Sequence, residues 1–293
     1  MIVIGSRGSQ LALWQARWVQ SQLAAAGVES RIEIIKTTGD KILDVPLSQV
    51  GSKGLFTKEI EDALLDGSVD LAVHSLKDMP TELPAGLTLA AIPEREDVRD
   101  AIIGCTLDAL PHGARVGTSS LRRTAQLRAM RPDLAIESVR GNVDTRLRKL
   151  DEGQFKAILL AAAGLRRLGW AGRIAEYISP EQMCPAVGQG ALAIETREDR
   201  VAVAAPLEHP ATRAAITAER AMLGALGGGC QVPIGAYAVL DGPALHLRGI
   251  VATQDGSRIV RGMRSGTSAE AAATGRALAA DLLSQGAREL LQA

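Results

Sequence analysis

Short runs typical of β-strands alternate with amphipathic helical patterns from the first residues of the chain onward. In the first block, we expect strands at Ile2–Gly5, Arg31–Lys36 and Val69–Val73 and helices at Gln10–Ala26 and Thr57–Asp66. This order predicts βαβ units and a mainly parallel sheet. Ligands of such folds generally lie at the carboxyl ends of the strands, so functional residues are expected there.

A second block repeats the same alternation after the charged, proline-containing stretch Ile92–Asp97, which is a plausible linker. Two similar lobes with a cleft between them are therefore expected. The predicted strands of this block are Arg115–Gly117, Ala135–Val139 and Ala157–Ala161, and the predicted helices begin at Ser120, at Asn142 and near Gly164.

After Pro206 the pattern changes to a helix over Ala211–Leu226, a glycine loop, three strands and a final long helix. The dipeptides Asp241-Gly242 and Asp255-Gly256 are typical of hairpin turns. Thr267 and Glu270 have the spacing of a capping box that opens the last helix. These features predict a small antiparallel α+β domain.

Composition excludes several classes of protein. The 293 residues contain 33 basic and 33 acidic side chains, so bulk attraction to nucleic acid or to an anionic membrane is not expected. Cys105, Cys184 and Cys230 are widely spaced, which argues against a zinc ribbon and a disulfide framework. No secretion leader or membrane-spanning run is evident, so we expect a reduced, cytoplasmic protein.

Three glycines lead directly into a thiol in the segment Gly227–Pro233. Glycine runs mark tight turns or the close approach of another group, which would leave Cys230 accessible to a ligand. The alternative is that Cys230 is a small buried apolar residue beside a flexible loop.

Two arginine-rich segments, Thr118–Arg123 and Arg140–Lys149, open predicted helices of the second lobe, with Asn142 as a natural N-cap. Arginine in a first helical turn faces the positive end of the helix dipole, so a negative group is expected to offset it. Free amides, hydroxyls and guanidinium groups at helix starts would bind a carboxylate or a phosphate. The alternative is a solvated face in which Arg123 pairs with a surface acid.

The first lobe adds Arg7 and Ser9 after its first strand, and Lys53, Gly54 and Lys58 before its second helix. The lysine segment lacks the spacing of a Walker loop, but its glycines indicate a mobile loop that can close over an anion. Taken alone, Lys58 is equally well explained as an ordinary surface lysine.

Asp78 lies in the segment His74–Pro80, directly after the predicted strand Val69–Val73. A carboxylate among many cations stays ionised and can stabilise positive charge that develops on a substrate. An isolated Asp at a strand end is also a common turn residue.

Together these segments resemble the hydroxymethylbilane synthase family, also called the porphobilinogen deaminases. The motifs HSLKDMP, GTSSLRR, RGNVDTRL, PAVGQGALAIE and GGGCQVPIG occur in the family's order. The resemblance implies an enzyme that joins four porphobilinogen molecules head to tail with loss of ammonia. Such an enzyme then releases the linear tetrapyrrole by hydrolysis. The resemblance also implies a dipyrromethane primer attached through a thioether to Cys230.

The resemblance assigns further roles. Asp78 would be the catalytic acid, which holds pyrrole nitrogens and stabilises the cation formed as ammonia leaves, and no metal is implied. The cofactor-binding set would be Cys230, Lys77, Asp78, Thr118, Ser119, Ser120, Arg122, Arg123, Arg140, Gly141 and Arg146. The substrate-binding set would be Arg7, Ser9, Arg140, Arg146 and Arg167, with Lys53, Gly54 and Lys58 in the mobile loop.

We therefore predict an α/β enzyme with two lobes of the periplasmic-binding-protein type around a cleft. A small α+β domain with a three-stranded antiparallel sheet follows. Domain 1 is expected to comprise residues 1–94 and 190–206, domain 2 residues 98–186, and domain 3 residues 210–293. We expect a monomer that binds porphobilinogen and has no nucleic-acid or membrane partner.

The residues alone leave two rival functions open. A two-lobed module that binds anions without catalysis, such as the effector domain of a regulator, would share the lobes and the arginines. RNA binding by the arginine-rich lobe would favour aromatic side chains among the arginines, whereas aromatic residues make up only 2% of the chain.

Overall fold

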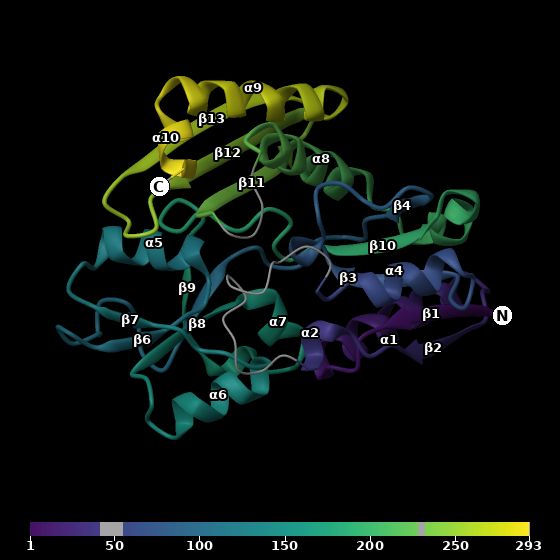
Figure 1. Cartoon of the computed structure of the whole chain (residues 1–293), viewed down its shortest axis with the longest axis horizontal. Helices are drawn as coiled ribbons and strands as arrows, with labels where there is room; N and C mark the ends of the chain where they lie inside the picture. Colours follow the sequence, from purple (N-terminus) through teal and green to yellow (C-terminus); the bar gives the residue numbers. More distant parts are fainter. Residues whose placement is uncertain (42–54, 228–231, 293) are drawn as a thin grey trace. The chain divides into compact units, whose positions relative to one another are not determined.

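The computed structural model describes residues 1–41, 55–227 and 232–292 (Figure 1). The chain divides into two compact units. Unit 1 comprises Met1–Glu96 and Ala191–Arg213, and unit 2 comprises Asp97–Gly190 and Ala214–Ala293. The three predicted domain boundaries are not decided by this division and stay a prediction.

Unit 1 is built on a five-stranded sheet with the strand order β2-β1-β3-β10-β4. Its strands are β1 (Ile2–Ser6), β2 (Ser30–Ile34), β3 (Leu71–Ser75), β4 (Leu87–Ala91) and β10 (Leu192–Arg197). β1 pairs in parallel with β2 and β3, whereas β10 runs antiparallel to β3 and β4. The sheet is therefore mixed and not mainly parallel as predicted, because β10 returns from a distant part of the chain.

Helices cover both faces of this sheet. The helices of unit 1 are α1 (Gln10–Ala25), α2 (Thr38–Lys41) and α4 (Lys58–Leu65), with 3-10 turns at Leu76–Asp78 and Glu198–Leu207. On one face, Val19 and Leu23 of α1 are fully buried in a cluster with Leu71. On the other face, Ile60 and Leu64 of α4 are buried in a cluster with residues of β3 and β4. This burial explains the apolar periodicity of both helices.

The first sheet of unit 2 has the order β7-β6-β8-β5-β9. Its strands are β5 (Asp100–Ile103), β6 (Arg115–Gly117), β7 (Ala135–Glu137), β8 (Ala157–Ala161) and β9 (Ile174–Ile178). Its helices are α5 (Leu121–Met130), α6 (Val143–Asp151) and α7 (Ala162–Arg167), with a 3-10 turn at Ala171–Arg173. β6 runs parallel to β7 and β8, so the segments that follow these three strands begin at the same edge of the sheet.

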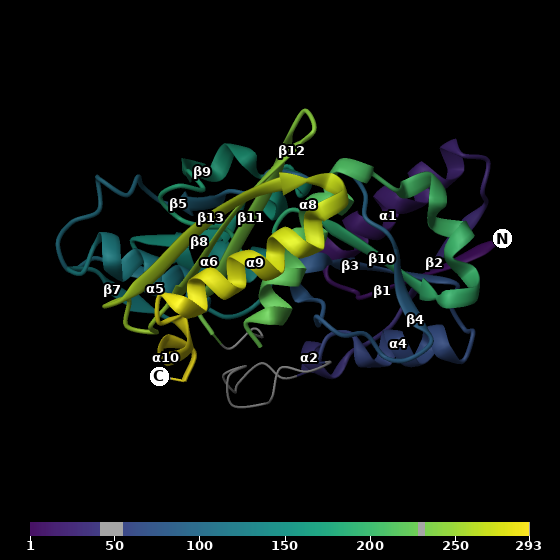
Figure 2. The same ribbon diagram turned by 90° about the horizontal axis from the view of Figure 1, so that it is seen from above.

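The C-terminal part of unit 2 contains a three-stranded antiparallel sheet, as predicted. The strands are β11 (Ile234–Asp241), β12 (Ala244–Ala252) and β13 (Ile259–Thr267). The helices of this part are α9 (Ala271–Ser284), α10 (Ala287–Gln292) and α8 (Pro210–Ala225), of which the residues up to Arg213 belong to unit 1. Figures 1 and 2 show α9 running along this sheet, and Leu278 of α9 shares a buried cluster with Leu247 of β12.

Both predicted hairpin turns and the predicted capping box are present in this part. Gly242 and Gly256 have φ angles of +56° and +74°. The capping box of Thr267 and Glu270 opens a 3-10 turn, Ser268–Glu270, that leads directly into α9. Glycine is required at the turns because other residues rarely adopt these φ angles.

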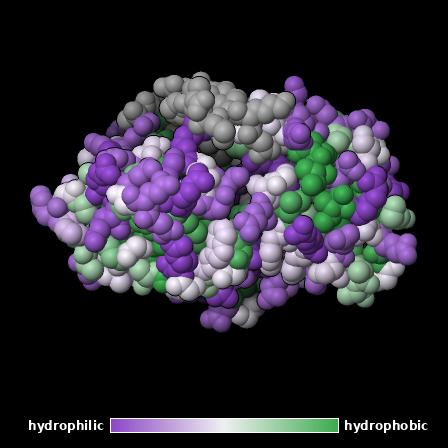
Figure 3. All heavy atoms as spheres, turned by 90° about the horizontal axis from the view of Figure 1, so that it is seen from below, coloured by the Kyte–Doolittle hydropathy of each residue, from purple (hydrophilic) through white to green (hydrophobic). Residues whose placement is uncertain are grey.

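In the described ranges, no helix is long and apolar enough to cross a membrane. The face of the molecule in Figure 3 shows hydrophilic residues spread among smaller hydrophobic areas.

Candidate functional site

Asp78 ends the 3-10 turn that follows β3 without a break. The residues on either side of Lys77 and Asp78 anchor this turn, because Leu76 and Met79 are 1% and 5% exposed. The Leu76 amide also donates to the Ala191 carbonyl at 3.0 Å, and the Met79 amide donates to the Leu76 carbonyl at 3.0 Å. Asp78 itself is exposed. The fold therefore presents this carboxylate to solvent from a fixed turn.

The predicted cations of unit 1 have different surroundings. The Arg7 guanidinium lies 4.2 Å from the centre of the Phe56 ring, which is a cation–π contact. Ser9 is the N-cap of α1, and its hydroxyl accepts from the Ala12 amide at 3.3 Å. Lys58 is the exposed first residue of α4. Lys53 and Gly54 lie outside the described residues.

In unit 2 the predicted site residues follow the carboxyl ends of the parallel strands β6, β7 and β8. After β6, the Thr118 amide donates to the Glu137 carbonyl at 2.9 Å, and the Ser119 hydroxyl donates to the Val139 carbonyl at 2.6 Å. Ser120 caps α5, where its hydroxyl accepts from an amide of the first turn. The parallel topology thus places these residues and those after β7 and β8 at one edge of the sheet, as predicted.

Arg122 and Arg123 at the start of α5 both bind the buried Asp100 of β5. Arg122 Nη1 lies 2.6 Å from Asp100 Oδ2, and Arg123 Nε lies 2.8 Å from Asp100 Oδ1. The Asp100 side chain is completely buried, and the arginine side chains are 5% and 7% exposed. The negative group that the helix start requires is therefore an interior carboxylate, and not the surface acid of the alternative interpretation.

The charges around Asp100 determine its ionisation. Burial alone would raise the pKa of Asp100, but the guanidinium groups of Arg122 and Arg123 hold that pKa well below its ordinary value. Gln189 Nε2 adds a hydrogen bond to Asp100 Oδ1 at 3.0 Å. Asp100 is thus an ionised carboxylate inside unit 2.

Cys184 lies beside this network, because its carbonyl accepts from Arg122 Nη1 at 2.7 Å. Burial raises the pKa of the Cys184 thiol to about 12. A thiol with such a pKa is not a nucleophile at neutral pH, since the thiolate is the reactive form.

The start of α6 combines a left-handed glycine with two arginines. Gly141 has a φ of +109°, and Arg146 Nε donates to its carbonyl at 2.8 Å. Asn142 occupies the N-cap position, but its side chain makes no capping hydrogen bond. Arg140 Nη1 is buried, and none of residues 1–41, 55–227 and 232–292 offers it a hydrogen-bond acceptor. The start of α6 therefore holds a buried cationic donor for which the described residues supply no acceptor.

Arg167, the last residue of α7, is 8% exposed, and its Nη2 donates to the Gly190 carbonyl at 2.7 Å. Cys230, the predicted attachment residue, lies outside the described residues, between α8 and β11. In the part of the chain that the structure describes, no cluster of His, Cys, Asp and Glu side chains is placed to hold a metal ion.

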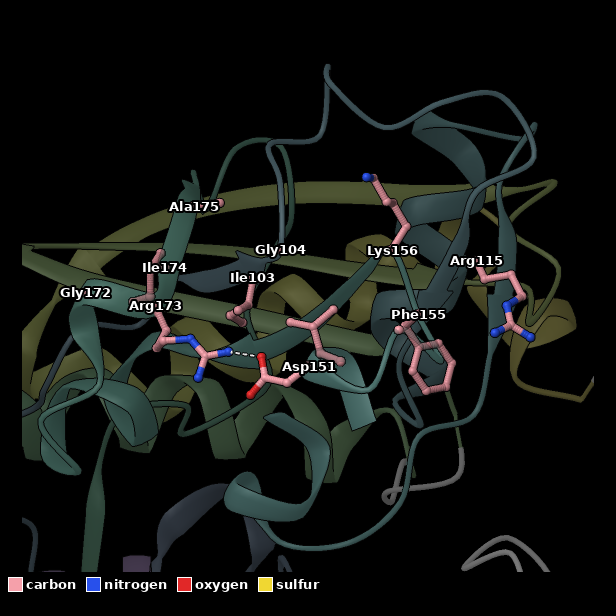
Figure 4. A pocket seen from close by; sticks show the side chains of 12 residues that line it. Ile103, Gly104, Arg115, Asp151, Phe155, Lys156, Gly172, Arg173, Ile174 and Ala175 are labelled. Atoms are coloured by element: carbon pink, nitrogen blue, oxygen red, sulfur yellow. Dashed lines mark hydrogen bonds and ion pairs between the residues drawn. The ribbon is translucent and has the colours of Figure 1, made fainter. Parts of the chain in front are cut away.

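Unit 2 also has an open pocket of about 830 Å³. Figure 4 shows Arg173 paired with Asp151 at this pocket, with Phe155, Lys156 and Arg115 nearby. The pocket lies where β6, β8 and β9 begin, which is the edge of the sheet opposite to the predicted site. None of the predicted site residues lines it.

Sequence reasoning missed two polar residues that organise the unit 2 site, Asp100 and Gln189. Asp100 is the first residue of β5 and directly precedes the apolar run Ala101–Ile103 that makes up the rest of this strand. The sequence signal for Asp100 is an acidic residue at the start of an apolar run. The sequence analysis predicted neither a strand there nor the pairing of Asp100 with Arg122 and Arg123.

Comparisons with known proteins agree with one another. Residues 2–205 match the family model described as porphobilinogen deaminase, dipyromethane cofactor binding domain, and residues 213–284 match porphobilinogen deaminase, C-terminal domain. A protein of Roseiflexus sp. (strain RS-1) named porphobilinogen deaminase is 55% identical over 298 residues, covering 99% of this chain and 98% of the relative. One of the same name from Chromobacterium violaceum is 55% identical over 300 residues, covering 100% of this chain and 97% of the relative.

Solved structures with a similar chain path include a periplasmic substrate-binding protein of an ABC transporter from Coxiella burnetii. It is 14% identical, with a TM-score of 0.44, covering 72% of this chain and 93% of that chain. The methionine-binding protein MetQ is also 14% identical, with a TM-score of 0.43, covering 68% of this chain and 84% of that chain.

Proposed function

The chain belongs to the porphobilinogen deaminase family, and from this premise we propose roles for the residues at the strand ends of both units. The protein is a hydroxymethylbilane synthase, a transferase of tetrapyrrole biosynthesis. It joins four porphobilinogen molecules head to tail, with loss of one ammonia each time, and releases the linear product by hydrolysis. Its cofactor is dipyrromethane.

The residues of unit 2 fit a ligand that carries several carboxylates. Each pyrrole of the cofactor and of the substrate bears an acetate and a propionate group. Arg140 Nη1 and Arg122 Nε are buried and have no hydrogen-bond acceptor among the described residues. Buried donors are nearly always satisfied in native proteins, and a hydrogen bond to a charged group contributes about 1.5–3 kcal/mol. A carboxylate ligand would supply the missing acceptors.

The cofactor, when bound, supplies the pyrrole to which the first substrate is joined. The proposed residues that hold it are Cys230, Lys77, Asp78, Thr118, Ser119, Ser120, Arg122, Arg123, Arg140, Gly141 and Arg146. Arg122 and Arg123 enter this set with Asp100 already bound, so they are oriented before any ligand arrives. We propose Arg7, Ser9, Arg140, Arg146 and Arg167 as the residues that bind the carboxylates of the substrate.

Asp78 is proposed as the catalytic residue, and its exposure on an anchored turn is the observation that supports this role most. Its carboxylate can accept a hydrogen bond from a pyrrole N–H. It can also stabilise the positive charge that develops on the substrate while the amino group of its aminomethyl side chain leaves as ammonia and the methylene carbon stays on the pyrrole. Because the buried Leu76 and Met79 fix the turn, the carboxylate needs little reorganisation during the reaction.

The attachment of the cofactor to Cys230 also belongs to this proposal, as does a loop containing Lys53 and Gly54 that closes over the substrate; Lys58, which was expected in this loop, begins α4 instead. The same holds for the three domains at residues 1–94 with 190–206, 98–186 and 210–293. We further propose that the enzyme is cytoplasmic and that it is a monomer. Sedimentation of the purified protein would test the second point, since a monomer should give the mass of one chain.

Replacing Asp78 with Ala tests the proposed role. Loss of an electrostatic catalyst typically lowers the rate by about 10²- to 10³-fold, so porphobilinogen consumption and ammonia release should fall at least that far. The exposed Glu82, four residues further on, provides the control, since Glu82→Ala removes an acid from the same segment. Turnover of Asp78→Ala close to that of Glu82→Ala, with both proteins folded, would refute the assignment.

A further inference from the structure

Three titratable side chains are buried on the face of the unit 1 sheet that α4 covers. They are Glu61 of α4, His74 of β3 and Glu195 of β10. The function proposed above uses none of them. Buried ionisable groups are unfavourable for folding unless they are compensated. Their position near the turn that carries Asp78 therefore indicates a functional role.

His74 and Glu195 contact each other across two strands. His74 Nε2 lies 3.0 Å from Glu195 Oε2, and the two side chains are 5% and 0% exposed. In the antiparallel register, His74 lies opposite Ala193 and Glu195 lies opposite Ala72. The two residues are thus diagonal neighbours on one face, so their contact ties the end of β3 to β10.

Among the described residues, His74 is the group placed to compensate the Glu195 carboxylate. The contact is an ion pair when the imidazole is protonated. Neither oxygen of Glu195 accepts a hydrogen bond from any residue that the structure describes. A buried carboxylate without such compensation is strongly unfavourable, so loss of either partner leaves the other poorly accommodated.

The opposite face of β3 is held at the next residue. Gln15 of α1, which is 2% exposed, donates from Nε2 to the Ser75 hydroxyl at 2.9 Å. His74 and Ser75 are therefore fixed from opposite faces of the sheet, directly before the turn Leu76–Asp78. Because this turn continues directly from β3, the position of Asp78 depends on the positions of His74 and Ser75 at the end of the strand.

We propose that His74 and Glu195 are positioning residues for Asp78, because their buried contact holds the end of β3 from which the catalytic turn projects. The inference rests on the role proposed for Asp78. It assigns no contact with substrate to either residue.

Glu61 stands outside this pair and provides a matched control. Burial raises the pKa of Glu61, and the negative charge of Glu195 adds to this, while the Thr57 hydroxyl and His74 oppose it. Glu61 therefore holds its proton more readily than an exposed glutamate, and glutamine resembles the protonated form. Glu61→Gln and Glu195→Gln make the same chemical change on the same buried face.

The test compares kcat and KM for porphobilinogen in these variants. A reacting group that is displaced by about 1 Å can lose about 10²-fold in rate, so Glu195→Gln should lower kcat at least tenfold. The KM of Glu195→Gln should change less than twofold, because the interaction that a displaced Asp78 loses is the one made in the transition state. His74→Gln should show the same pattern, and the double variant should be no slower than the slower single variant. Glu61→Gln should stay within twofold of wild type in both constants.

Adding Glu195→Gln to the Asp78→Ala protein distinguishes positioning of Asp78 from a general structural role of Glu195. In Asp78→Ala, the residual single-turnover rate should not fall further when Glu195→Gln is added, and thermal unfolding of each variant checks folding independently. A wild-type kcat for Glu195→Gln, or a further tenfold loss in the Asp78→Ala background, would overturn the inference. If Glu195→Gln does not fold, His74→Gln decides, because it removes the same buried contact from the β3 side.

The two proposals fail in different ways. Normal turnover of Asp78→Ala would refute the proposed function itself. Loss of turnover in Asp78→Ala together with normal kcat in Glu195→Gln would refute only the positioning role.

Discussion

Replacing Asp100 with Asn keeps the shape of the side chain but removes the charge that two buried arginines share. Arg122 and Arg123 bind this carboxylate at 2.6 and 2.8 Å, and all three side chains are at most 7% exposed. Removing one partner of a buried ion pair typically costs about 3–5 kcal/mol, because the remaining charge is left uncompensated. At about 2–4 °C per kcal/mol for a unit of this size, we expect the melting temperature of unit 2 to fall by about 6–20 °C.

Hydrogen exchange measures this effect where it arises. Peptides from β5 and α5 of Asp100→Asn should exchange much faster than in wild type, whereas peptides from α1 in unit 1 serve as an internal reference. Asp151→Asn is the matched control, since Asp151 pairs with Arg173 at 2.5 Å but both side chains are at least 41% exposed. Exposed pairs contribute about 0–1 kcal/mol, so this variant should change little.

The pH dependence provides a second check. Because the pKa of Asp100 in the folded protein lies well below its ordinary value of 3.8, the stabilisation is fully present above that value. The difference between wild type and Asp100→Asn should therefore stay constant from neutral pH to about pH 4 and shrink only at more acidic pH. An Asp100→Asn protein within 1 kcal/mol of wild type, or one no less stable than Asp151→Asn, would refute the reasoning.

Three further outcomes follow from the structure. In the native protein at pH 8, iodoacetamide should label the half-buried Cys105 before Cys184, whose pKa is raised by burial to about 12; equal labelling would contradict this burial. Gly256→Ala should lower the free energy of unfolding more than Gly242→Ala. Both glycines have positive φ, but only at Gly256 would the added carbon meet the α5 backbone. Equal losses of unfolding free energy in urea would contradict this expectation. Arg140→Leu should lower cofactor assembly or chain elongation at least tenfold, as a charged hydrogen bond contributes about 1.5–3 kcal/mol, and full activity with a normal cofactor would remove Arg140 from the site.

Local patterns predicted most of the secondary structure because each element carries its own signal. The helix Gln10–Ala25 has buried residues at helical spacing and a serine cap, and the turns at Gly242 and Gly256 carry the Asp-Gly signature. The strand order could not be predicted in the same way. β10 pairs with both β3 and β4 although at least a hundred residues separate it from them in sequence, and no local pattern encodes that pairing.

The candidate site shows the same division between local and distant information. The strand-end positions of Asp78, Thr118 and Arg140 follow from the alternation of strands and helices. The partners of the site residues do not, because Asp100 reaches Arg122 from 22 positions earlier and Glu195 reaches His74 from across the sheet. Contacts of this kind depend on the packed interior, which the sequence pattern does not display.

The central claim is that this chain builds a tetrapyrrole on a cofactor attached to Cys230. The most direct test is the intact mass of the denatured protein and of Cys230→Ser, before and after incubation with porphobilinogen. The account predicts a covalent excess of two deaminated porphobilinogen units on the parent, stepwise further additions with substrate, and no excess on Cys230→Ser. A parent protein with the unmodified mass, which porphobilinogen does not change, would contradict it.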